Sequence, residues 1–92
     1  MKIRVLLLGC SLGFCSAGDV AVGTASAKEG QKATGFIQVA AGVDAGTNIP
    51  VIVINGAKPG PKLAIVAGAH GTEYASIIAL EKLARAINAA DL

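Results

Sequence analysis

The sequence predicts an α/β fold, and three observations support that prediction. Two short β-prone runs, 36–40 and 51–54, are separated by a segment rich in Gly, Asp and Asn that is typical of a turn or loop. A third run, 63–67, is apolar throughout. Residues 73–90 then repeat apolar side chains at helical spacing. Strands followed by a helix in this order are typical of an α/β domain.

The first 17 residues predict a cleaved secretory signal peptide. Lys2 and Arg4 give a positively charged start, and an apolar stretch follows from Val5. The triplet 15–17, Cys-Ser-Ala, places small residues at positions −3 and −1 of a signal-peptidase site. The apolar stretch is shorter than the roughly 20 residues that a spanning helix needs. We therefore expect export to the periplasm or the medium and no stable membrane span.

Two other interpretations of this leader remain open. Residues 3–8 also suit a buried N-terminal strand. Residues 7–10, Leu-Leu-Gly-Cys, loosely resemble a lipoprotein box, although the apolar segment before Cys10 is short for one. The cleavage point also stays open between residue 17 and positions slightly beyond it.

Without the leader, the chain is close to neutral and has no cysteine. Removing Lys2 and Arg4 from the eight Lys and Arg leaves six, which equals the number of Asp and Glu. Both cysteines, Cys10 and Cys15, also lie in the leader. We therefore expect no nucleic-acid partner, no disulfide framework and no cysteine-type zinc site. Any metal must be held by His, Asp or Glu.

The N-terminal half of the mature chain is predicted to hold a lead-in and a hairpin. Residues 18–34 are rich in small and polar side chains without periodicity, which indicates a flexible lead-in. The runs 36–40 and 51–54 are expected to pair as an antiparallel hairpin, with Pro50 at a strand start. Residues 55–61 contain several turn-forming residues and predict a second loop.

The C-terminal half is predicted to form a buried strand, a tight turn and a helix. The run 63–67 has no polar alternation, which suits a strand covered on both faces. Thr72 is the expected N-cap, and Glu81 and Arg85 form an i, i+4 pair on the outer face. The apolar face of the helix is made of Ile77, Leu80, Leu83, Ala84 and Ile87.

The predicted elements do not complete a domain. A strand-to-helix unit normally leads to another parallel strand, and a strand covered on both faces needs neighbours. The single Tyr and two Phe are few large side chains for a self-sufficient core. We therefore expect residues 35–92 to be the N-terminal part of a larger, truncated domain.

The segment His70-Gly71-Thr72-Glu73 is the candidate site. It follows the end of a parallel-type strand, where α/β sheets build binding sites. His70 and Glu73 stand three residues apart, Gly71 is expected to let the backbone turn between them, and both side chains are good zinc ligands. A catalytic zinc usually takes three protein ligands, and His70 is the only His, so a site of two His and one Glu must take its second His from beyond Leu92. By spacing alone, a surface His beside an ordinary helix-start carboxylate is the commoner situation.

The longer stretch 59–74, Pro-Gly-Pro-Lys, an apolar run, then Gly-x-His-Gly-x-Glu-Tyr, resembles the zinc-motif region of the succinylglutamate desuccinylase/aspartoacylase family. That family is related to the zinc carboxypeptidases. Residues 46–51 also fit the early hairpin of the family, so the resemblance spans about 35–90. Thr72 departs mildly from the Asp or Asn that is common at this position, and this departure touches neither ligand.

The resemblance implies a zinc-carboxypeptidase-like mixed sheet and a zinc-dependent hydrolase, with residues 35–92 as the incomplete N-terminal part of its catalytic domain. In such an enzyme His70 and Glu73 are two zinc ligands, and a later His, a general-base Glu and substrate-binding arginines complete the site. The implied substrate is a small acylated, carboxylate-bearing molecule that is cleaved at an amide or ester bond. None of the remaining parts has a counterpart here, so we expect no catalytic residue within this chain and no activity from it alone.

Two other functions remain open at this point. The first is a zinc carboxypeptidase that acts on peptides, because the shared motif does not distinguish the two substrate classes. The second is a small exported protein that binds a metal or a partner and catalyses nothing. The oligomeric state cannot be inferred from the sequence.

Overall fold

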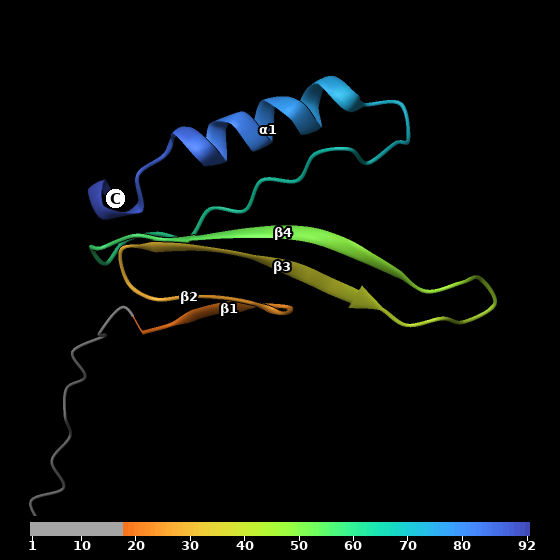
Figure 1. The fold of residues 1–92 in the computed structure, drawn as a ribbon, viewed down its shortest axis with the longest axis horizontal. Coiled ribbons are helices and arrows are strands. Elements are labelled where there is room, and N and C mark those ends of the chain that lie inside the picture. The colour runs from red at the N-terminus through yellow and green to blue at the C-terminus, as the bar shows by residue number, and fades with distance from the viewer. Residues whose placement is uncertain (1–17) are drawn as a thin grey trace, which may run out of the picture.

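The computed structural model describes residues 18–92, which form two antiparallel two-stranded sheets and one α-helix (Figure 1). The mixed α/β class is thus confirmed. The predicted signal peptide, and with it both cysteines, lies outside the described residues. The elements are β1 (Val20–Val22), β2 (Ala25–Ala27), β3 (Gln31–Val39), β4 (Thr47–Asn55), α1 (Tyr74–Ala86) and a final 3-10 turn, η1 (Ala89–Asp91). No helix in the range 18–92 is long and apolar enough to cross a membrane.

The β3–β4 ribbon is the longest part of the fold. Its register runs from Gln31 opposite Asn55 to Val39 opposite Thr47, so the predicted hairpin is confirmed and is longer than expected. Pro50 lies inside β4 opposite Phe36, and not at a strand start as predicted. Proline is tolerated there because β3 is the only strand paired with β4 among the described residues, which makes β4 an edge strand.

The predicted flexible lead-in, residues 18–34, instead contains β1, β2 and the first part of β3. Gly23 turns the chain between β1 and β2 with a φ of 58°, a value that glycine adopts without strain. The backbone N–H of Thr24 then donates to the carbonyl of Phe36 at 2.9 Å, and the N–H of Phe36 donates to Thr24 Oγ1 at 2.9 Å. These strands have only three residues each and are held by contacts with β3, so local periodicity could not reveal them.

The buried core lies where the β1–β2 hairpin packs on the ribbon. Ala25, Ala27 and Val53 form it, and three partly buried apolar residues pack around them, namely Val20, Ala33 and Val51. Asn55 is also buried, with 7% of its surface exposed. Its Nδ2 donates to the carbonyls of Ala27 at 3.0 Å and Gly18 at 3.1 Å. One polar side chain therefore ties the start of the described chain to the end of β4.

The apolar run 63–67 is not a strand, contrary to the prediction (Figure 1). It runs between β4 and α1, and Leu63 and Val66 are 84% and 87% exposed. A strand forms by pairing its backbone with a neighbour, and no described segment pairs with this one. The sequence pattern of a strand covered on both faces is therefore present here without its partners.

Helix α1 begins and ends differently from the prediction. Its N-cap is Glu73, and not Thr72, and no side chain caps the first turn. The helix ends at Ala86, because Ile87 adopts an extended conformation. The expected pair of Glu81 and Arg85 is present as an exposed ion pair of 3.9 Å. Such a pair contributes little to stability in water.

Candidate metal centre

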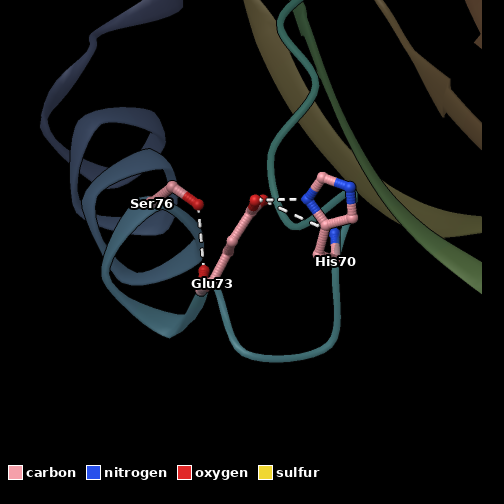
Figure 2. Close-up of polar contacts among 3 residues, drawn as sticks. All are labelled: His70, Glu73 and Ser76. Atoms are coloured by element: carbon pink, nitrogen blue, oxygen red, sulfur yellow. Dashed lines mark hydrogen bonds and ion pairs between the residues drawn. The ribbon is translucent and has the colours of Figure 1, made fainter.

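His70 and Glu73 converge in the turn that leads into α1. Figure 2 shows the Glu73 carboxylate pointing toward the His70 ring, with Nδ1 and Oε1 separated by 2.6 Å. The backbone N–H of His70 lies 3.5 Å from Glu73 Oε2, and the N–H of Glu73 donates to the carbonyl of His70 at 3.2 Å. The three-residue spacing thus brings an imidazole nitrogen and a carboxylate oxygen to one point, as the sequence predicted.

The Glu73 carboxylate is directed to His70, and not to the free N–H groups of the helix. This explains why α1 has no side-chain cap, since the residue at its N-cap position contacts the preceding turn. The Ser76 hydroxyl binds within the same turn, where Oγ donates to the Glu73 carbonyl at 2.9 Å (Figure 2). Ser76 therefore stabilises the first turn of the helix.

The positive φ that turns the chain is at Gly68, and not at Gly71 as predicted. Gly68 has a φ of 76°, and a Cβ there would lie 2.6 Å from Ile77 Cδ1. Gly71 does not have a positive φ, and a Cβ there would meet nothing within 4 Å. The left-handed conformation that turns the chain toward α1 is thus located two residues before His70.

Both candidate ligands face solvent. The His70 side chain is 80% exposed and the Glu73 side chain is 42% exposed. A structural zinc site is closed by four protein ligands, whereas a catalytic site keeps a position for water. Both donor atoms are therefore accessible to solvent and to a metal ion in the described structure.

The donor chemistry of the pair fits zinc. Two donors that share a tetrahedral zinc ion stand roughly 3.3 Å apart, because each is about 2.0–2.2 Å from the metal. The observed 2.6 Å is a hydrogen-bond distance, so metal binding has to replace this bond. Both side chains are exposed enough to separate by small rotations. Within the range 18–92, no three His, Cys, Asp or Glu residues gather into a group, so these two donors stand without a third.

Two residues that hold parts of the fold together, both far from the site, were not found from the sequence. Lys32 reaches from β3 to the C-terminal end of α1. Asn55 hydrogen-bonds the β1–β2 hairpin to the end of β4. Lys32 lies in a stretch interpreted as a lead-in, and Asn55 in one interpreted as a loop. A lone Lys or Asn in such stretches carries no local signal, because its partners are distant in sequence.

The comparisons with known proteins identify one family. Residues 59–92 match the family model described as the succinylglutamate desuccinylase/aspartoacylase catalytic domain. The comparison with curated proteins gives no match, and neither does the comparison with solved structures. The resemblance found in the sequence is thus confirmed for residues 59–92, the stretch that contains both His70 and Glu73 and that matches the catalytic domain of the succinylglutamate desuccinylase/aspartoacylase family.

Proposed function

We propose that this chain is the N-terminal part of an exported, zinc-dependent hydrolase in which His70 and Glu73 are two of the three protein zinc ligands. The observation that supports this most is the convergence of Nδ1 and Oε1 at 2.6 Å inside the segment that matches a hydrolase family. The proposed substrate is a small acylated, carboxylate-bearing molecule that is cleaved at an amide or ester bond. The completed domain is proposed to have the mixed sheet of the zinc carboxypeptidases.

In this mechanism the residues of the chain hold and orient the metal. His70 would offer a ring nitrogen to the metal, and Glu73, the residue just before α1, would offer a carboxylate oxygen. When bound, zinc supplies Lewis acidity toward a carbonyl and a lowered pKa for a water ligand. The third ligand, the general base and the arginines that bind substrate are expected beyond Leu92. The chain printed here is therefore proposed to be inactive alone.

Zinc binding can be measured directly by isothermal titration calorimetry of the full chain with Cys10 and Cys15 replaced by serine, because thiolates also bind zinc. We expect weak, one-to-one zinc binding that is lost in both His70→Ala and Glu73→Gln. Binding should weaken as the pH falls, because protons compete with zinc for both ligands. Ring signals of His70 in NMR spectra should shift on zinc addition as its hydrogen bond to Glu73 is replaced.

Glu81→Gln is the matched control for Glu73→Gln. It removes an exposed carboxylate from the same helix at a position with no His beside it. Equal loss of zinc binding in this control, or unchanged binding in His70→Ala, would contradict the assignment. In the longer gene product, a panel of N-acyl amino acids tested beside short peptides would separate the deacylase from the carboxypeptidase. Turnover of neither class with zinc bound would favour a non-catalytic binding protein.

Export is part of the same proposal and has its own test. A mature chain that starts at Gly18 suits the fold, because Asn55 Nδ2 binds the Gly18 carbonyl at 3.1 Å. Expression of the whole sequence in a bacterial host should give a periplasmic or secreted product. N-terminal sequencing should then begin at or slightly after Gly18. An intact Met1 on a product that stays in the cytoplasm would refute it.

A further inference from the structure

One side chain of the β3–β4 ribbon holds the C-terminal end of α1. Lys32, on β3, places its Nζ 2.9 Å from the carbonyl of Ala84, 3.2 Å from that of Arg85 and 2.6 Å from that of Ile87. These are the only side-chain hydrogen bonds between the ribbon and the helix end among residues 18–92. They link positions that lie more than 50 residues apart in sequence.

The donors and charge of Lys32 match the carbonyl acceptors and negative dipole at the end of α1. The last carbonyls of a helix have no partner within the helix, and they form the negative end of its dipole. A lysine ammonium carries a positive charge and three N–H donors. Lys32 therefore meets three carbonyl acceptors with three donors and places its charge where the helix dipole favours it.

Elsewhere the helix is held loosely. An open groove of about 520 Å³ separates the apolar face of α1 from β4 and from the segment 63–68. Ala84 is the only buried residue of α1, and it lies next to the Lys32 contact. After the helix, the N–H of Ala57 donates to the carbonyl of Ala89 at 3.2 Å, which fixes η1 to the end of β4. The helix is thus attached at its C-terminal end and open along its length.

We propose that Lys32 is a positioning residue that sets the angle of α1 on the β3–β4 ribbon and thereby places the His70–Glu73 pair. The pair lies at the opposite end of a helix of 13 residues, which is about 20 Å long. A tilt of about 10° at the attached end moves the other end by roughly 3 Å. The consequence for zinc chemistry depends on the proposed function, whereas the helix angle is a property of the fold.

The angle can be measured without metal. Spin labels at Gln38 on β3 and at Ala79 on α1, both exposed, report the distance between ribbon and helix in the full chain. Cys10 and Cys15 are replaced by serine in this background. We expect a single narrow distance distribution in the parent chain. In Lys32→Met the distribution should broaden. The ratio of molecules at the parent distance to molecules at longer distances should fall roughly tenfold.

Two variants make the test specific. Lys82→Met removes a lysine from α1 that makes no hydrogen bond through its side chain in the described structure, and it should keep the narrow distribution. Lys32→Arg should restore most of it, because a guanidinium also presents several charged donors. An unchanged distribution in Lys32→Met, or equal broadening in Lys82→Met, would overturn the proposal.

A folding control and a zinc control complete the experiment. If circular dichroism shows that Lys32→Met has lost its β-structure, Lys32→Gln replaces it, since the amide keeps two of the three donors and should broaden the distribution partially. An unchanged distribution in folded Lys32→Gln also overturns the proposal. Zinc titration of His70→Ala tests the proposed function separately, so failure of one idea leaves the other measurable.

Discussion

Replacing Gly23 with alanine is expected to lower the free energy of unfolding by about 3 kcal/mol. Gly23 has a φ of 58°, and a Cβ there would lie 2.1 Å from the carbonyl oxygen of Phe36. The left-handed conformation alone costs alanine about 1–2 kcal/mol. The clash adds to this, because the Phe36 carbonyl oxygen accepts a hydrogen bond from the Thr24 N–H and cannot move away freely. Urea denaturation followed by circular dichroism measures the change.

The matched control is Gly42→Ala in the β3–β4 loop. A Cβ at Gly42 would meet nothing within 4 Å, and its φ is not positive. We expect a change in stability below about 0.5 kcal/mol there. Equal effects at the two glycines would mean that the β1–β2 hairpin contributes nothing to the stability of the ribbon, which would contradict the packing described above.

Replacing Asn55 with aspartate is expected to destabilise the fold by about 3 kcal/mol at neutral pH. The amide Nδ2 donates to two backbone carbonyls, those of Gly18 and Ala27. A carboxylate has nearly the same shape but no donor, and it would place a buried negative charge against two carbonyl oxygens. Thermal unfolding compared with the parent chain measures this loss.

Two further variants separate the charge from the lost hydrogen bonds. Asn55→Ala leaves both carbonyls without this donor, and it should cost about 2 kcal/mol. Asn48→Asp makes the same chemical change at an exposed position of β4 and should be close to neutral. If Asn55→Asp were no worse than Asn48→Asp, the Asn55 amide would not be holding the hairpin to the ribbon.

The elements that the sequence predicted well are those defined by local pattern. The β3–β4 pairing follows from two β-prone runs around a loop, and α1 follows from apolar side chains at helical spacing. The convergence of His70 and Glu73 was also predictable, because three residues of separation leave little freedom. Each of these features depends on residues that are near neighbours along the chain.

What the sequence did not reveal depends on distant partners. The strands β1 and β2 have only three residues each, and hydrogen bonds to Phe36 and to the buried Asn55 hold their hairpin in place. The run 63–67 shows the converse. It has the composition of a buried strand, but it stays exposed because no described strand pairs with it. Lys32 could not be assigned a role, since its three acceptors lie more than 50 positions away.

These distances along the chain also set the order in which the parts assemble. The innermost pair of the ribbon, Val39 and Thr47, closes a loop of only eight positions, whereas the link between Lys32 and Ala84 closes one of 52. Because the entropy lost on closing a loop grows with its length, the β3–β4 ribbon should form first, and the helix should dock onto it later. The two residues proposed to hold zinc therefore reach their place among the last, on a scaffold that is already folded.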